Sequence, residues 1–368
     1  MTTRNLLIIA QKEFFDHVRS RRFLLIFGIL LVVAIVGLIG GITDYNKNLD
    51  DYNKAQSTIS SERGAFIQEK PSILGVFSSV STYLVFVGAV LGIAMGFDLI
   101  SKEKESRSLK ILLSHPVYRD EVINGKALGG IIALGCALGV VLFIALATLL
   151  VYGIVPDGNE LVLIAVFGGV SFLLIFSFFA IALFMSAAMD ESGSALIYTI
   201  IIFIVLSVLV PTLANNTVME NVVGSQPELP QELLDQMQRT MNTNNSMTVG
   251  MVVMKDSDQN SEAWNRFNDQ MQAYWEKRQM VHDTLALFSP TMNYAAITSA
   301  ITYQTAGSDL VLDSGGGGKS TSFSVTKRED AGIDAILGKI IPNIIALLLF
   351  PAVFFGMAYV RFMRLDVR

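Results

Sequence analysis

The stretch that decides the fold is DLISKEKESRSLKILLSHPVYRDEVINGK, residues Asp98–Lys126. It lies between two long runs, 71–97 and 127–156, that contain no charged residue. Each run exceeds the ~20 apolar residues that a helix needs to cross ~30 Å of hydrocarbon. The charged stretch is therefore predicted to connect two membrane-spanning helices.

Further runs of this kind predict an all-α integral membrane protein. The four other runs without Asp, Glu, Lys, Arg or His are 23–43, 161–189, 192–219 and 340–360. The composition agrees, because 52% of the 368 residues are hydrophobic and 16% are charged, against about a quarter charged in soluble chains. Another uncharged run, 284–308, is only about half apolar, so we expect it to lie outside the membrane or on its surface.

Basic residues orient the six predicted helices. Lys and Arg cluster in residues 1–22, in 98–126 and in the C-terminal tail. If the helices alternate, all three clusters fall on one side, which the positive-inside rule makes cytoplasmic. Both termini are then expected inside. The first apolar run is expected to stay as an anchor, because a long basic region precedes it and no clear A-x-A site follows.

Two polar segments, 44–70 and 215–338, are then expected outside the membrane. The larger one is acidic and carries two N-x-[ST] sequons, at Asn215 and Asn244. Part of it has aromatic and apolar residues at alternating spacings of three and four, which is typical of a helix packed on another helix, although such a stripe could also line a ligand groove. The residues of this stripe are Trp264, Phe267, Met271, Tyr274, Arg278, Val281, Leu285 and Phe288.

Several function classes lose support from the sequence. Ionisable residues inside membrane helices usually mark proton relays or catalysis, and the six predicted helices have none. A single cysteine, Cys136, excludes an internal disulfide. A net charge of −5 gives no support to a nucleic-acid partner. The stretch Asp313–Ser320 resembles a phosphate loop, but Asp313 replaces the first glycine, so we expect a flexible linker there. We expect no enzyme, metal or cofactor site on this chain.

The middle of the charged stretch predicts a short amphipathic helix that projects into the cytosol. Glu103 and Arg107 are spaced as a favourable i,i+4 pair. Three leucines then form an apolar face, and a proline after His115 ends the helix. Such a face favours docking into a groove on a partner protein. The residues proposed to make this contact are Glu103, Glu105, Arg107, Leu109, Leu112, Leu113, His115 and Pro116.

Residues 1–22 predict an amphipathic helix in the membrane interface, ahead of the first span. Its defining residues are Phe14, Val18, Arg19, Arg21 and Arg22. Glycines four residues apart in the second and third spans predict close helix packing, inside one chain or between subunits. These glycines are Gly88, Gly92, Gly96, Gly135 and Gly139.

The charged stretch resembles the signature of type-2 ABC exporter permeases, which often reads E-x-E-x-G-T-L-K. Here Glu103 and Glu105 match, Ser106–Arg107–Ser108 departs from it, and Leu109–Lys110 matches again. The N-terminal helix is similar to the family's elbow helix. The resemblance implies domains at 1–22 (elbow), 23–214 (five membrane helices), 215–338 (extracytoplasmic) and 339–368 (sixth helix and tail).

The resemblance also implies a function. Such permeases carry no ATPase and pair with a cytosolic ATPase subunit, which holds ATP and Mg, usually as two permeases with two ATPases. The segment Lys102–Ser114 would be the coupling helix, and loop 188–194 a minor ATPase contact. This implies a multi-pass protein of a prokaryotic cell membrane. The alternative is a non-transport module that is anchored by its helices and binds or assembles through residues 215–338.

Overall fold

The computed structural model describes residues 3–59, 71–108, 118–214, 216–231, 234, 258–302 and 333–365, and these residues form helices and connecting turns without a strand. They divide into two compact units, Val205–Ser289 and the remainder, Met1–Ile204 with Pro290–Arg368. The larger unit contains α1 (Thr3–Arg19), α2 (Arg21–Ile59), η1 (Ile73–Val76), α3 (Phe77–Tyr83), η2 (Leu84–Gly88), α4 (Ala89–Gly96), α5 (Ser101–Glu105), α7 (Arg119–Val151), α8 (Gly158–Ala188), α9 (Ser192–Ile204), α15 (Pro290–Thr302) and α16 (Ile333–Met363).

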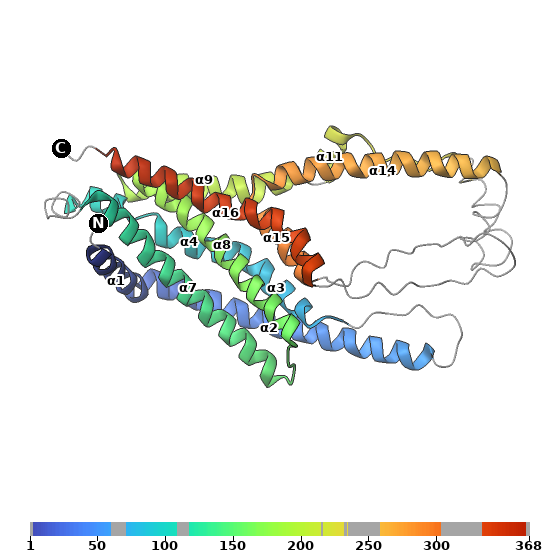
Figure 1. The fold of residues 1–368 in the computed structure, drawn as a ribbon, viewed down its shortest axis with the longest axis horizontal. Coiled ribbons are helices and arrows are strands. Elements are labelled where there is room, and N and C mark those ends of the chain that lie inside the picture. Colours follow the sequence, from blue (N-terminus) through green and yellow to red (C-terminus); the bar gives the residue numbers. More distant parts are fainter. Residues whose placement is uncertain are drawn as a thin grey trace. The chain divides into compact units, whose positions relative to one another are not determined.

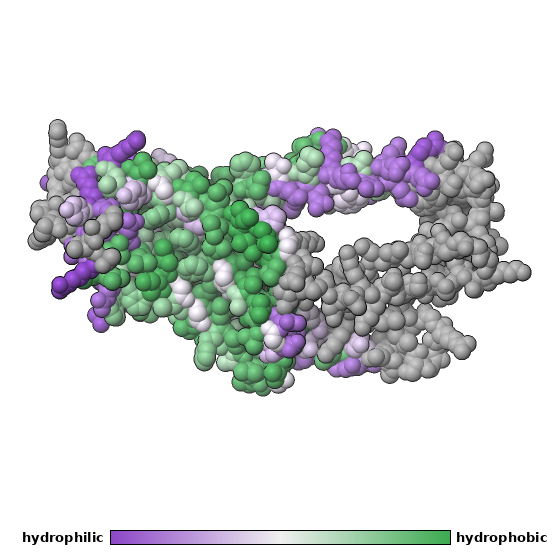
Figure 2. All heavy atoms as spheres, in the orientation of Figure 1, coloured by the Kyte–Doolittle hydropathy of each residue, from purple (hydrophilic) through white to green (hydrophobic). Residues whose placement is uncertain are grey.

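Within the described residues, six helical stretches are long and apolar enough to cross a membrane, as predicted. They are Arg21–Lys54, Ile73–Glu105, Arg119–Val151, Gly158–Ala188, Ser192–Leu213 and Ile340–Met363. Apolar side chains gather in a broad band over these helices, and hydrophilic side chains gather at the end where α1 lies (Figure 2). The C-terminal end of α16 lies at this same end (Figure 1). The apolar band is what a lipid-facing surface requires.

Local sequence signals set the helix ends. Ser20 separates α1 from α2, and its Oγ accepts the backbone N–H of Phe23 at 3.1 Å. Asp157 caps α8, because its carboxylate accepts the backbone N–H of Gly158. Gly153, with a φ of +75°, follows the end of α7. An L-residue with a side chain is rarely stable at such a φ, so glycine permits the turn there.

Helix α8 is the centre of the larger unit and packs against α4, α7, α9, α15 and α16. Two of the predicted packing glycines explain the contact with α4. A Cβ at Gly96 would lie 2.7 Å from Phe179 O and one at Gly92 would meet Ile175 O, whereas Gly88, the last residue of η2, faces the Ile175 side chain. The absence of side chains therefore lets the two backbones touch within one chain. Gly135 and Gly139 make no such approach to any residue that the structure describes, so their role in packing stays a prediction.

Helix α15 belongs with the membrane helices, although the sequence division at residue 215 groups it with the polar insertion. It packs against α3, α8 and α16. The Tyr294 hydroxyl and Ser171 Oγ are both buried and lie 3.0 Å apart, within hydrogen-bonding distance. This polar pairing explains how a segment with many Ser and Thr residues can be buried here. At 13 residues, α15 is too short to be a span.

The smaller unit contains η3 (Val205–Leu209), α10 (Val210–Leu213), α11 (Asn216–Val223) and α14 (Asp258–Ala286). Met219 and Val223 of α11 form a small core with Tyr274 of α14. Val281 and Leu285 pack on this core, so part of the predicted aromatic and apolar stripe contacts another helix. The linker at 313–320 and the sequons Asn215 and Asn244 lie outside the described residues.

Candidate functional site

A buried lysine joins three helices at the end of the bundle that contains α1. Lys126 Nζ of α7 lies 2.7 Å from Glu13 Oε1 of α1 and 2.8 Å from Glu103 Oε1 of α5. The Lys126, Glu13 and Glu103 side chains are 3%, 9% and 21% exposed. We call these three residues the Lys126 cluster. A buried cation with two carboxylates at this distance holds its three helices in one arrangement, since separating them leaves unpaired buried charge.

Close backbone packing places Glu13 within reach of Lys126. Gly125 and Gly129 of α7 lie under α1, and a Cβ at Gly129 would be 2.7 Å from both Ala10 O and Glu13 Cβ. A Cβ at Gly125 would similarly meet Ile9 at 2.8 Å. Because neither glycine has a side chain, α1 can lie directly on α7.

The charge of Lys126 decides the protonation of Glu13. Burial alone raises the pKa of the Glu13 carboxyl, but the attraction of Lys126, its hydrogen bond and the nearby Lys12 together lower the pKa below its usual value. A carboxyl whose pKa is lowered by folding stabilises the folded state above the pKa of an unfolded glutamate. That stabilisation is lost as the pH falls through the lowered pKa. The Glu13 carboxylate is therefore charged at neutral pH.

Lys104 and Glu105, the next two residues of α5, form hydrogen bonds with the turn between α8 and α9. Lys104 Nζ donates hydrogen bonds to Ala187 O at 2.7 Å and to Met189 O at 2.9 Å, at the C-terminal end of α8. Glu105 accepts a hydrogen bond of 2.7 Å from Ser192 Oγ, at the first residue of α9. A cation at a helix C-terminus and a carboxylate at a helix N-terminus both oppose the helix dipole favourably. Adjacent residues thus bind both ends of this turn.

Two more contacts attach the flanks of segment 109–117 to the bundle. Arg22 of α2 forms an ion pair of 3.0 Å with Asp98. Arg119, at the start of α7, donates to Leu365 O at 2.7 Å and to Met363 O at 3.3 Å, beyond the end of α16. The two flanks of the segment are therefore attached to α1, α2, α7, α8, α9 and α16.

The predicted docking residues divide into two groups. Glu103 and Glu105 lie in the contacts above, and Arg107 lies in the turn after α5. Segment 109–117 lies outside the described residues. It contains Leu109, Leu112, Leu113, His115 and Pro116.

The predicted Glu103–Arg107 pair is wrong. Helix α5 ends at Glu105, so Arg107 is not one helical turn above Glu103, and Glu103 pairs with Lys126 instead.

The predicted elbow region contains the helix α1, which ends at Arg19, so Arg21 and Arg22 belong to α2. Phe14 and Val18 are half-buried, whereas Arg19 and Arg21 are exposed and Arg22 pairs with Asp98. The sequence reasoning missed Glu13, Lys126 and the two glycines under α1. A signal was available, because Glu13 follows Ala10 by three residues and therefore shares its face.

Arg107 takes the backbone conformation that suits glycine, with a φ of 57°. The left-handed region costs an L-residue ~1–2 kcal/mol. We therefore expect Arg107→Gly to raise the melting temperature of the purified protein slightly, and Arg107→Ala to leave it unchanged or lower it. The exposed Arg107 side chain forms no ion pair with the other described residues, so its removal costs little. A lower melting temperature for the glycine variant than for the alanine variant would contradict the assigned backbone conformation.

The family model described as ABC-2 family transporter protein matches residues 7–367, nearly the whole chain. The chain belongs to the ABC-2 transporter family. It is also similar to a probable ABC transporter permease protein, NosY, of Pseudomonas aeruginosa, with 28% identity over 190 residues. The match covers 51% of this chain and 61% of that relative, so it spans about three fifths of the relative's length.

The family membership confirms the resemblance found in the charged stretch. It identifies this ABC-2 protein as a membrane component of an ABC transporter. In the motif E-x-E-x-G-T-L-K, the glycine aligns with Arg107, the residue with positive φ. The two motif glutamates are the residues that contact Lys126 and Ser192. The motif therefore has a structural meaning in this chain: its acidic residues join the segment to the helices around it.

Proposed function

We propose that this protein is the permease subunit of an ABC exporter and that residues 98–126 couple it to a separate cytosolic ATPase. In this proposal segment 109–117 docks into the ATPase, which binds ATP and Mg. Movement of the docked segment shifts α5 and, through α5, the helices that line the transport path. The chain would work as two permease copies with two ATPases in a prokaryotic cell membrane.

The observation that supports this most is the set of attachments on both sides of segment 109–117. Lys126 links α5 to α1 and α7, while Lys104 and Glu105 link α5 to the turn between α8 and α9. The Lys126 and Lys104 contacts are short and largely buried, so they resist separation, and a displacement of α5 would be passed on rather than absorbed locally. A solvated loop between two anchoring helices would need no such attachments.

The distribution of charge supports the proposed orientation. The positive-inside rule places α1, the 98–126 region and the C-terminal end of α16 on the cytoplasmic side. The apolar runs within the six spans contain no charged residue, which favours a transporter that is driven by a separate ATPase over an ion-coupled carrier. Residues 215–289 would then lie outside the cell. The proposed export direction rests on the family resemblance of the 98–126 motif.

Leu112→Glu tests the docking step. A charge on the apolar face of the segment should prevent insertion into a protein groove, so we expect the recovery of an ATP-binding cassette subunit with the tagged chain to fall at least tenfold. The measurement is the molar ratio of ATPase subunit to permease after purification in mild detergent. Asn48→Glu, which adds the same charge at an exposed position of α2, is the control and should leave the ratio unchanged. Full recovery with the Leu112→Glu variant would contradict the proposal.

A further inference from the structure

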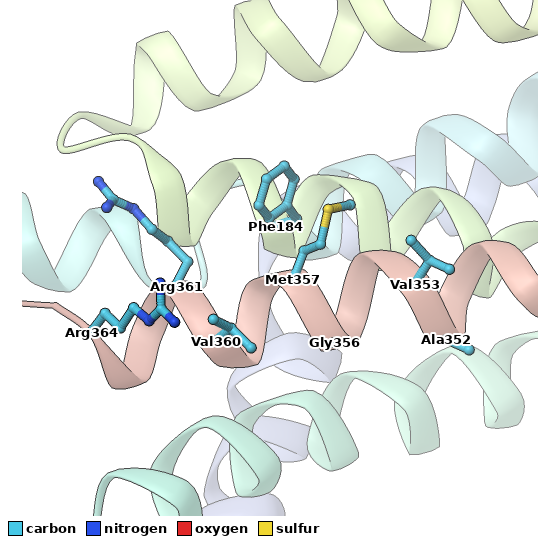
Figure 3. A pocket seen from close by; sticks show the side chains of 8 residues that line it. All are labelled: Phe184, Ala352, Val353, Gly356, Met357, Val360, Arg361 and Arg364. Carbon is cyan, nitrogen blue, oxygen red and sulfur yellow. The ribbon is translucent and has the colours of Figure 1, made fainter.

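An open groove of about 520 Å³ lies along α16 beside α8, and its two ends differ in chemistry. Figure 3 shows the arginines at one end of the row of lining residues and valine and alanine at the other. The apolar wall of the groove extends from Ala352 and Val353 to the arginines. The lining residues that matter here are Phe184 of α8, Arg364 just beyond the end of α16, and four residues of α16: Val353, Met357, Val360 and Arg361.

The two arginines are available to a ligand. Both are exposed, and no carboxylate among the described residues forms an ion pair with either of them. Two other basic residues at this end of the bundle already have partners: Lys104 donates to carbonyls at the end of α8, and Arg119 donates to Leu365 O beyond the end of α16. Arginine binds phosphate oxygens through two parallel hydrogen bonds, so a pair of arginines favours a phosphate group.

The dimensions of the groove fit one leaflet of a membrane. Its apolar wall extends from Ala352 to Val360, which is ~12 Å along a helix, and one leaflet of a bilayer has ~15 Å of hydrocarbon. The candidate span of α16 ends at Met363, so a bilayer that covers this span would place its headgroups at the depth of Arg361 and Arg364. Basic pockets between membrane helices at this depth are typical sites for anionic lipid headgroups.

We propose that this groove binds an anionic phospholipid. Its headgroup phosphate contacts Arg361 and Arg364, and one acyl chain lies along Val353, Met357 and the Phe184 ring. The charge of the groove favours this occupant over a second copy of the chain, because a helix packed here would have to cover two arginines that have no carboxylate partner within the described residues. The proposed site does not depend on the ATPase-coupling function.

The test measures lipid retention by the purified full chain with native mass spectrometry. We expect the wild-type protein to retain phosphatidylglycerol at least tenfold better than phosphatidylcholine. Arg361→Gln combined with Arg364→Gln should abolish this preference. Arg21→Gln is the control, since Arg21 is an exposed arginine at the start of α2, outside the groove, and should leave the preference unchanged.

A second variant tests the groove separately from the charges. A Cβ at Gly356, which lines the groove, has no heavy atom within 4 Å, so Gly356→Leu can fill the groove without disturbing the helices. We expect this variant to keep its melting temperature and both arginines but to lose phosphatidylglycerol at least tenfold. Excess glycerol phosphate, which has no acyl chain, should not displace the bound lipid.

Four results would overturn the proposal. The first is equal retention of the two lipids by the wild-type protein, and the second is unchanged preference in the double arginine variant. The third is evidence that the site is only a phosphate contact. This evidence would be either full retention of phosphatidylglycerol by Gly356→Leu or displacement of that lipid from the wild-type protein by glycerol phosphate. The fourth is a change from dimer to monomer in the variants with lipid retention unaltered, which would identify the groove as an interface between copies.

Discussion

Lys126→Met is expected to destabilise the protein by ~3–5 kcal/mol, because removing one partner of a buried ion pair leaves uncompensated charge. Here the substitution leaves Glu13 at 9% exposure without its 2.7 Å partner, and Glu103 without its 2.8 Å partner. The measurement is the melting temperature of the purified protein in detergent. ATPase-coupled activity should fall with it, since α5 loses its attachment to α1 and α7.

The matched control for this substitution is Lys12→Met. Lys12 also reaches Glu13 Oε1, at 3.4 Å, but its side chain is 63% exposed, and exposed pairs contribute ~0–1 kcal/mol. Adding Glu13→Gln and Glu103→Gln to Lys126→Met should recover much of the lost stability, because the two carboxylates then no longer need a cation. A Lys126→Met protein as stable as the Lys12→Met protein would show that the Lys126 cluster does not hold the helices together.

Gly129→Leu is expected to separate α1 from α7. A Cβ at this position would already lie 2.7 Å from Ala10 O, which belongs to the backbone and cannot rotate away. Overpacking of this kind costs ~1–3 kcal/mol or more, and the displaced α1 would withdraw Glu13 from Lys126. Gly139→Leu on the same helix is the control, since nothing lies within 4 Å of a Cβ there.

Disulfide formation can report the separation directly. Asn5 Nδ2 of α1 donates to Glu121 Oε2 of α7 at 3.4 Å, so these two side chains face each other. Asn5→Cys with Glu121→Cys, in a Cys136→Ser background, should oxidise readily in the native packing. We expect the cross-link to be lost with Gly129→Leu and kept with Gly139→Leu. A cross-link that forms equally well in both would contradict the close packing of α1 on α7.

The sequence predicted the membrane helices well because their signal is local. A run without charge of about 20 residues can be recognised without knowing its neighbours. All six runs correspond to candidate spans in the structure, and the run 284–308 does not. The end of the first span was harder to place. Helix α2 continues through polar residues to Ile59, beyond the apolar run that ends at residue 43.

The candidate site could be predicted only in part, because its contacts join distant residues. Glu13 and Lys126 are 113 residues apart, and neither belongs to a sequence motif that predicts a contact with the other. Gly125 and Gly129 have the small-residue spacing of a packing site, but the spacing does not identify α1 as the partner. The motif predicts a coupling role for Glu103, but the sequence spacing predicted its partner to be Arg107, whereas the structure pairs it with Lys126. Tertiary packing decided the actual partner.

The most direct test of the ATPase-coupled permease proposal is the composition of the native complex. The tagged chain would be purified from its own membranes in mild detergent, and its partners quantified by mass spectrometry. We predict an ATP-binding cassette subunit in about equal amount to the chain, lost with the Leu112→Glu variant. Recovery of an extracytoplasmic protein without any ATPase would contradict the proposal and favour a module that is anchored by its helices and acts through residues 215–338.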